Sequence, residues 1–298
     1  MNSAHENAAE REQAITDEVL AAFSATADPR LRAIVRSLIG HLHAFAREVR
    51  LTEGEWEAGI DFLTRAGHVT DDRRQEFVLL SDVLGLSTLT AALDAPDAPG
   101  ATEATVLGPF FVDGAPEIPL GGDLAQGAPG TPCHVSGRVR STDGSPVGGA
   151  LLDVWGADED GLYDVQYPGE RCAGRGRLRT DADGGYRFWT VLPTPYPIPH
   201  DGPAGDLLTA CGRGPMRPAH LHFKATARGF RTLITHLFVA GDPHLARDAV
   251  FGVRDSLVVE AAHHDDGTAP DGSRRRGAWT SMAFDLVLAP DHGSVPGR

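Results

Sequence analysis

The segment Thr180-Asp-Ala-Asp-Gly-Gly-Tyr-Arg-Phe-Trp-Thr-Val191 combines a turn signal with the alternation of a strand. Asp and Gly favour tight turns, and the alternation from Tyr186 onward is typical of a β-strand with one buried face. The same combination occurs earlier, where His134-Val-Ser-Gly-Arg-Val139 precedes the turn signal Thr142-Asp-Gly-Ser-Pro146. From about residue 103, short apolar runs are separated by Asp-Gly, Pro and Gly. This spacing predicts an antiparallel β-sandwich.

The preceding third of the chain has helical periodicity. Within residues 10–94, one apolar stripe recurs at three-to-four spacing and is formed by Leu31, Ile34, Val35, Leu38, Leu42, Phe45 and Val49. Thr52-Glu-Gly-Glu55 has the form of a capping box at a helix start, and another helix is expected from about Asp71. Asp94-Ala-Pro-Asp-Ala-Pro-Gly100 ends the pattern. We therefore predict an α+β protein, with an N-terminal helical dimerisation or linker domain at residues 1–102 and a β-sandwich domain at residues 103–298.

Composition excludes several classes of partner. The 298 residues carry 27 Lys and Arg against 41 Asp and Glu, a net charge of -14, whereas nucleic acids and anionic membranes bind clustered basic residues. No apolar run approaches the roughly 20 residues that span a bilayer. Cys133, Cys172 and Cys211 are scattered and form no CxxC pair, which favours a reducing compartment. With no export signal in the first residues, we expect a cytoplasmic protein that neither binds nucleic acid nor inserts into membranes.

Two histidines in Arg217-Pro-Ala-His-Leu-His-Phe223 are the first candidate metal ligands. The run is apolar, and residues at i and i+2 of a strand point to the same side, so His220 and His222 can reach one ion. The same spacing in His41-x-His43 falls in a helical stretch, where the two residues are roughly 200° apart and cannot chelate one ion. The alternative for the strand pair is two ordinary histidines satisfied by hydrogen bonds.

Two of the four tyrosines lie in loops where a phenol need not fill a core. Tyr163 follows Asp160-Gly-Leu162, and Tyr196 lies between Pro195 and Pro197, which hold its backbone extended. A phenolate is a hard oxygen ligand that favours Fe(III), so two tyrosines with two histidines indicate a non-haem ferric site and oxygenase chemistry. Otherwise Tyr163 caps the core at a strand end and Tyr196 anchors a rigid loop.

These residues lie in segments that resemble the intradiol ring-cleaving dioxygenases. Together with the helical third, the resemblance extends over nearly the whole chain, and its segments are Thr105-Val-Leu-Gly-Pro-Phe-Phe111, Asp153-Val-Trp-Gly-Ala-Asp-Glu-Asp-Gly-Leu-Tyr163, Val191-Leu-Pro-Thr-Pro-Tyr196, Arg217 to Phe223 and Ala240-Gly-Asp-Pro243. It implies one non-haem Fe(III) per chain, held by Tyr163, Tyr196, His220 and His222. Tyr196-Pro-Ile-Pro-His-Asp-Gly-Pro-Ala-Gly205 is most similar to the branch that cleaves hydroxyquinol, and His236 stands where catechol-cleaving relatives carry Gln.

The resemblance also implies roles for neighbouring side chains. Tyr196 would accept a substrate proton, and the guanidinium of Arg217 would stabilise the anionic, ketonised substrate, unless it is only a salt-bridged loop arginine. His236 joins the site if the strands expected at residues 220–226 and 232–239 pair. The substrate contacts of the hydroxyquinol branch correspond to Leu79, Asp82, Val106, Leu107, Gly108, Pro109, Phe110, Ile198, Pro199, Arg217 and Val250.

The implied reaction is cleavage of hydroxyquinol (1,2,4-trihydroxybenzene) by O2 to 3-hydroxy-cis,cis-muconate, which tautomerises to maleylacetate. Asp82 would receive the third hydroxyl, unless it lies on an exposed polar face of its helix. The family further implies a homodimer joined through the helical domain, often with a bound lipid. The nearest alternative is a catechol or chlorocatechol 1,2-dioxygenase. A cupin would need a glutamate after His222, which Phe223-Lys-Ala-Thr-Ala-Arg-Gly229 lacks, and a non-enzymatic transthyretin-like β-sandwich module would bind no iron.

Overall fold

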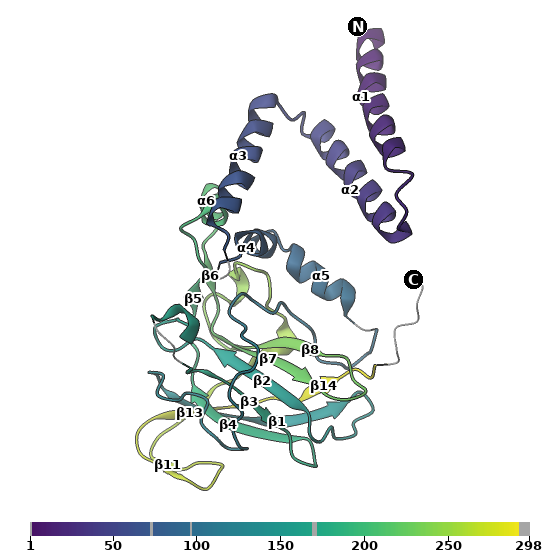
Figure 1. Cartoon of the computed structure of the whole chain (residues 1–298). Coiled ribbons are helices and arrows are strands. Elements are labelled where there is room, and N and C mark those ends of the chain that lie inside the picture. Colours follow the sequence, from purple (N-terminus) through teal and green to yellow (C-terminus); the bar gives the residue numbers. More distant parts are fainter. Residues whose placement is uncertain (1, 72–73, 96, 169–171, 292–298) are drawn as a thin grey trace. The chain divides into compact units, whose positions relative to one another are not determined.

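The computed structural model describes residues 2–71, 74–95, 97–168 and 172–291, and the chain divides into two compact units between Thr64 and Arg65 (Figure 1). The first unit is helical, and the second contains every strand of the described residues. The predicted α+β class is confirmed. The domain boundary expected at residues 102 and 103 falls within the second unit and stays a prediction.

The first unit consists of α1 (Asn2–Ala22), α2 (Pro29–Glu48) and most of α3 (Glu53–Val69). Asp28 caps α2, because its carboxylate accepts the backbone N–H groups of Arg30 and Leu31 at 2.7 and 3.2 Å. The capping box at the start of α3 is confirmed. The N–H of Thr52 donates to Glu55 Oε2 at 2.9 Å, and the N–H of Glu55 donates to Thr52 Oγ1 at 3.3 Å.

The apolar stripe of α2 is uncovered in the single chain. No residue of α2 is buried, and between 47% and 55% of the surface is exposed at each of Leu31, Ile34, Leu38, Leu42 and Phe45. Polar contacts around Thr16 of α1 join the two helices, with its Oγ1 2.7 Å from Arg47 Nη1 and 3.0 Å from His43 Nδ1. An exposed stripe of this length is a candidate protein–protein surface.

The first sheet of the second unit is built around β1. Its strands are β1 (Pro132–Ser141), β4 (Gly185–Val191), β10 (Ala262–His264), β13 (Trp279–Ala283) and β14 (Leu286–Leu288). β4 runs antiparallel to β1, but β13 and β14 run parallel to it, along residues 133–136 and 139–141 respectively. The sheets, predicted to be antiparallel, are therefore mixed. Turn signals reveal hairpins only, whereas parallel partners are distant in sequence.

The second sheet carries the histidine pair. Its order is β3 (Arg175–Arg179), β2 (Leu151–Gly156), β7 (His220–Thr226), β8 (Leu233–Val239) and β9 (Val258–Val259). β7 and β8 pair antiparallel, as predicted, and the register places His222 between Trp155 of β2 and His236 of β8. Two short ladders pair β5 (Tyr196–Pro197) with β6 (Met216–Arg217) and β11 (Gly267–Thr268) with β12 (Arg274–Arg275).

The two sheets pack through one core, which determines where the histidines point. Val135 of β1, Phe188 of β4 and Phe223 of β7 belong to this core and are 0% exposed. Successive residues of a strand point to opposite faces, so His220 and His222 lie on the outer face of the second sheet.

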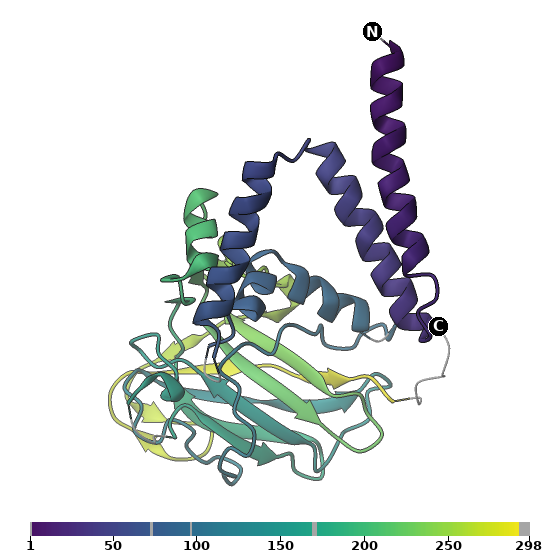
Figure 2. The same ribbon diagram turned by 45° about the horizontal axis from the view of Figure 1, so that its top comes forward.

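The second unit also contains α4 (Glu76–Val83), α5 (Leu86–Asp94), α6 (Pro203–Ala210) and the 3-10 turns η1 (Asp164–Gln166), η2 (Leu245–Arg247) and η3 (Asp255–Leu257). In both views, α4 and α5 lie on the β7–β8 side of this unit (Figures 1 and 2). The helix expected from about Asp71 begins at Glu76, and Gly85, with φ of +73°, separates α4 from α5. Among the described helices, none alone is long and apolar enough to cross a membrane; α4 and α5 meet that test only as a pair bent by 79°.

Candidate metal centre

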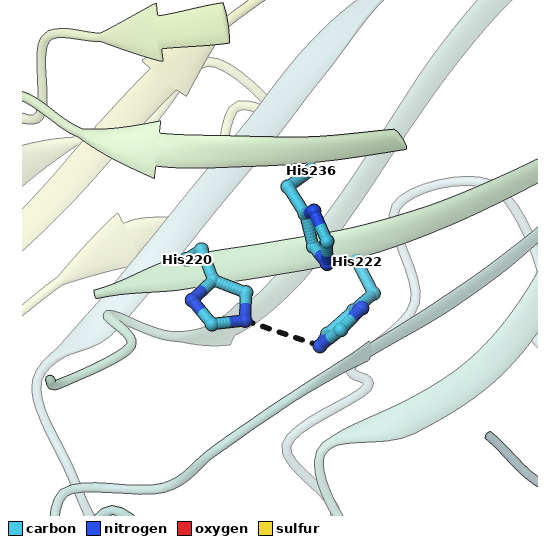
Figure 3. A group of neighbouring side chains, drawn as sticks. All are labelled: His220, His222 and His236. Atoms are coloured by element: carbon cyan, nitrogen blue, oxygen red, sulfur yellow. Dashed lines mark hydrogen bonds between the residues drawn. The ribbon is translucent and has the colours of Figure 1, made fainter. Parts of the chain in front are cut away.

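Three histidines meet on the outer face of the second sheet (Figure 3). His220 Nε2 lies 3.1 Å from His222 Nε2, and both side chains are 1% exposed. His236 projects from β8 with its ring centroid 4.2 Å from that of His222, so the strand pairing required for its place in the site is present. One nitrogen from each ring falls within 4.8 Å of the other two. This cluster could hold a metal ion.

Both candidate tyrosines reach the same point. Tyr163 Oη lies 2.9 Å from His222 Nε2 and donates to Tyr196 Oη at 3.2 Å. The approach depends on Gly161, which has φ of +74° and at which a Cβ would stand 2.9 Å from Tyr196 Cβ. On its other side, Tyr196 pairs with Arg217 in the β5–β6 ladder. The predicted tyrosines and histidines therefore converge from separate elements of the second unit.

The four donor atoms suit a metal ion. Along the series Tyr196 Oη, Tyr163 Oη, His222 Nε2, His220 Nε2, neighbours are 3.2, 2.9 and 3.1 Å apart. Nitrogen and oxygen ligands lie about 2 Å from a metal ion, so donor atoms spaced about 3 Å apart could contact one ion. His220 Nδ1 donates to Pro218 O at 2.6 Å, which places the lone pair of this ring on Nε2, the atom that faces His222. Two phenols with two such imidazoles fit a ferric ion.

Burial opposes charge on these side chains. It lowers the pKa of His220 to about 3, assisted by the charge of Arg217, so this imidazole is neutral, as a metal ligand must be. Burial, followed by neighbouring histidines, also lowers the pKa values of His222 and His236 well below the usual range. It raises the pKa of Tyr163 well above the ordinary value, and the adjacent Tyr196 adds to this effect. A cation at this point would favour the phenolate form instead.

Arg217 is buried beside the donors and only partly paired. Its Nε donates to Asp248 Oδ1 at 3.1 Å, and its Nη1 donates to His220 Nε2 at 3.1 Å. Its Nη2 has no hydrogen-bond partner among the described residues. Burial alone would raise the pKa of Asp248, but the charge and hydrogen bond of Arg217 hold it below the ordinary value. Arg217 is thus a salt-bridged arginine that also keeps one N–H group free for an anionic ligand.

The helical part of the predicted substrate wall is buried. Leu79 of α4 belongs to one apolar cluster with Ile198 and Val250. Asp82, further along α4, is 4% exposed, so it does not lie on an exposed helix face. Burial raises the pKa of its carboxyl, an effect that a hydrogen bond with Ser87 and the charge of Arg217 partly offset.

The loop part of the wall is formed by residues 105–111. Phe110 stacks on Tyr163 with ring centroids 4.5 Å apart, and Leu107 packs in the same cluster. Gly108, with φ of +77°, lies so close to the His222 ring that a Cβ there would stand 3.1 Å from Cε1. The three other predicted substrate contacts differ in burial. Val106 is buried, Pro199 is half-buried and Pro109 is exposed.

Sequence reasoning gave no role to two residues that fix the histidine rings. Trp155 stacks on His222 at 4.6 Å between centroids and 13° between planes. Thr105 Oγ1 lies 2.6 Å from His236 Nδ1, which directs the other nitrogen of His236 away from this contact. Both residues stand in the quoted motifs, so their presence was visible although their contacts were not.

A buried ion pair that the sequence did not reveal fixes the aromatic side of the site. Arg175 Nε donates to Asp164 Oδ1 at 2.8 Å, and Arg175 Nη1 donates to Phe110 O at 3.0 Å. Asp164 directly follows Tyr163, so the pair connects β3 to both the tyrosine and the loop stacked on it. This pair joins residues 11 positions apart and the contact of Arg217 with Asp248 joins residues 31 positions apart, and no local pattern marks either.

The fold and site define a two-sheet protein with a helical N-terminal region and a buried centre of tyrosines and histidines that could hold a metal ion. Family comparison agrees with this description. The family described as "Catechol dioxygenase N terminus" matches residues 28–102, and the family described as "Dioxygenase" matches residues 106–290.

Individual relatives match over almost their full length. A hydroxyquinol 1,2-dioxygenase of Nocardioides simplex is 58% identical over 281 residues, which are 94% of this chain and 96% of the relative. A solved hydroxyquinol 1,2-dioxygenase from Pseudomonas putida DLL-E4 has a TM-score of 0.88 and 43% identity, covering 94% of this chain and 99% of that one. A solved catechol 1,2-dioxygenase from Acinetobacter sp. ADP1 has a TM-score of 0.82 and 30% identity, covering 96% of this chain and 97% of that one.

The chain belongs to the intradiol ring-cleavage dioxygenase family. It is therefore an enzyme, and the alternatives of a cupin and of a non-enzymatic β-sandwich module are set aside.

Proposed function

We propose that this enzyme uses O2 to cleave hydroxyquinol between its two adjacent hydroxyl-bearing carbons, giving 3-hydroxy-cis,cis-muconate, which tautomerises to maleylacetate. The ring-cleavage part rests on one observation, the convergence of two phenols and two imidazoles beside the free N–H group of Arg217. The choice of hydroxyquinol rests on the relatives that carry this name and on the buried carboxyl group of Asp82.

One Fe(III) per chain would be held by Tyr163, Tyr196, His220 and His222. Two phenolates offset much of the ferric charge and favour that oxidation state. When bound, the ion supplies Lewis acidity toward the two adjacent hydroxyl groups of the substrate. The stacked ring of Trp155 keeps one imidazole in orientation, as a supporting residue should.

Protons and charge would be handled by the chain's own groups. Tyr196 Oη is the better placed of the two phenols to accept a substrate proton, because Tyr163 is already tied to His222 and stacked on Phe110. Arg217 Nη2 would donate to the substrate oxygen that becomes anionic, and in this buried setting such a bond is strong. The apolar wall around Leu79 would exclude water from the ring.

Specificity would come from polar groups near this wall. A third hydroxyl group without a partner here would be costly to bury. The carboxyl of Asp82 offers an acceptor, and His236 Nε2, which has no hydrogen-bond partner in the described part of the chain, offers a second contact close to the histidine pair. Catechol lacks this hydroxyl group and would leave Asp82 with its Ser87 hydrogen bond but without a partner on the substrate.

Oxygen uptake by the iron-loaded enzyme tests the reaction. We expect stoichiometric O2 consumption with hydroxyquinol, formation of maleylacetate, and a kcat/KM at least about tenfold above that for catechol. Faster turnover of catechol or chlorocatechol would support the nearest alternative instead. If the fully loaded enzyme turned over no substrate with adjacent hydroxyl groups, ring cleavage would be excluded.

The tyrosine ligands have their own signature. Phenolate-to-iron charge transfer should give the loaded protein a reddish colour and a broad visible band, and Tyr163→Phe or Tyr196→Phe should each shift or weaken that band. A colourless protein with one ferric ion per chain would contradict tyrosine ligation whatever the substrate.

We further propose a cytoplasmic homodimer joined through the apolar stripe of α2. The exposed side chains on one helix face support it, since such surfaces usually meet a partner. Light scattering should detect a dimer in the wild type and a monomer after combined Leu38→Asp and Leu42→Asp substitution, while Ser37→Asp, at an exposed polar position, should leave the dimer intact. A monomeric wild type would overturn the assembly. Mass spectrometry of organic extracts would detect the lipid that the family implies.

A further inference from the structure

A shallow, open pocket lies on the outer face of the first sheet, on β1 and β4. It has a volume of about 380 Å³ and is lined by His134, Ser136, Gly137, Arg138, Arg140, Gly185, Tyr186, Arg187, Pro270 and Asp285. The volume is in the range of small-molecule sites. Residues of β1 that alternate with the lining, such as Val135, face the core. The pocket is therefore on the opposite side of the two-sheet core from the tyrosines and histidines of the metal centre.

The floor of this pocket is a buried histidine without partners. His134 is 1% exposed, and neither of its ring nitrogens has a hydrogen-bond partner among the described residues. Its ring lies against the Trp189 ring at 5.1 Å. Burial, with Arg187 and Arg275 assisting against the opposite effect of Asp271, lowers the pKa of His134, so the imidazole is neutral and carries one N–H donor. A buried donor without a partner is costly unless a ligand satisfies it.

The walls add unpaired positive charge to a chain whose net charge is -14. Arg138 and Arg187 line the pocket as exposed side chains, and neither guanidinium has a hydrogen bond or ion pair within the described ranges. The one acidic lining residue, Asp285, is already engaged by the backbone N–H of Arg138 at 2.8 Å and by Arg140 Nε at 3.4 Å. Two guanidinium groups without partners and a histidine N–H donor, all lining one pocket, are suited to bind the oxygens of a doubly charged anion.

The tryptophan ring that packs against His134 is held in place. Trp189 Nε1 donates to Asp271 Oδ2 at 2.7 Å, and the guanidinium of Arg275 lies 3.8 Å above the Trp189 ring. Asp271 and Arg275 are thus occupied with Trp189 rather than with the pocket. The wall against which His134 lies is fixed before any ligand enters.

We propose that this pocket binds a small dianion, either a short dicarboxylate or a phosphate group, between Arg138, Arg187 and the N–H group of His134. The site is independent of the ring-cleavage reaction and of the metal. The ligand is expected to be an oxyanion because the guanidinium groups and the histidine N–H are all hydrogen-bond donors. The described lining residues offer no free carboxylate that would repel it.

Isothermal titration of the full-length protein with sodium succinate and with sodium phosphate tests the site, with sodium chloride at equal ionic strength as reference. We expect one of the two dianions to bind once per chain with heat that chloride does not give. Binding of succinate alone would identify a carboxylate site, and binding of phosphate alone a phosphate site. Equal responses to all three salts, or no specific heat up to about 10 mM, would overturn the proposal.

Variants connect that binding to the named residues. Combined Arg138→Gln and Arg187→Gln should raise the dissociation constant by about tenfold or more. His134→Phe should also raise it, while retaining an aromatic ring against Trp189. Arg228→Gln, which removes an exposed arginine elsewhere in the same unit, is the matched control and should leave binding unchanged. If His134→Phe does not fold, the arginine variant decides alone. Unchanged affinity in a folded arginine variant would mean an adventitious ion elsewhere.

Discussion

Two His-x-His sequences in this chain have the same spacing and opposite geometries. In β7, the Nε2 atoms of His220 and His222 are 3.1 Å apart and point into one buried site. In α2, where two residues are roughly 200° apart around the axis, His41 is exposed and His43 instead bonds Thr16 of the neighbouring helix. The comparison teaches that ligand spacing has chemical meaning only once the secondary structure is known.

Metal content should separate the two pairs most strongly. His220→Ala or His222→Ala should remove most of the iron, because a site with four protein ligands has little redundancy. His41→Ala and His43→Ala should retain it. Metal analysis of folded, purified variants provides the measurement, and equal iron loss from both pairs would break the comparison.

Each pair also has an arginine nearby, but only one arginine is expected to serve chemistry. Arg217 Nη1 contacts His220 directly, whereas Arg47 reaches His43 only through Thr16. Arg217→Gln should lower kcat/KM for hydroxyquinol by about 10²- to 10³-fold, the usual effect of losing one donor to a developing anion. Arg47→Gln should leave it unchanged. Steady-state kinetics at matched iron content tests this, and full activity of Arg217→Gln would remove its proposed role.

Asp82, in the proposed substrate wall near His220 and His222, should determine the preference for hydroxyquinol over catechol. Asp82→Ala removes a charge-assisted hydrogen bond worth roughly 1.5–3 kcal/mol, so kcat/KM for hydroxyquinol should fall about ten- to a hundredfold. Catechol turnover should stay level or rise, since catechol never makes this bond. Parallel losses on both substrates would show that Asp82 supports the pocket generally.

The smallest expected effect is on stability, after substitution of His41 or His43 in α2. His43→Ala removes a partly buried hydrogen bond to Thr16 and should lower the free energy of unfolding by about 0.5–1.5 kcal/mol. His41→Ala, at an exposed position, should change it by less than about 0.5 kcal/mol. Chemical denaturation of both variants measures the difference. Equal destabilisation would mean that His43 has no special structural role.

Much of the candidate site was accessible from the sequence, because its signals are local. His220 and His222 stand on a strand with recognisable alternation, and Tyr163 and Tyr196 follow turn and proline signals that predicted loop positions. Their ligand roles remain predictions, but the structure brings all four together. The family resemblance added Arg217, whose sequence neighbours alone do not distinguish a catalytic from a structural arginine.

The features that sequence reasoning missed depend on long-range contacts. Asp248 is the partner of Arg217, yet the two are 31 residues apart and no periodicity connects them. The parallel pairing of β1 with β13 was equally hidden, since hairpin turns announce only neighbouring strands. The burial of Asp82 could not be decided either, because the apolar pattern of α4 is compatible with more than one orientation of the helix.

The order in which the sheets can close follows from the pairing of β1. This first long strand has its parallel partners in β13 and β14, so one of its edges stays open during synthesis until residue 288 has left the ribosome. During that interval Val135 and Val139 lack Met282 and Leu286, with which they share the core. Open strand edges and bare apolar surface attract aggregation and chaperones. The segment with all four proposed ligands precedes β13 and β14 in the chain, so it is synthesised before this edge can close.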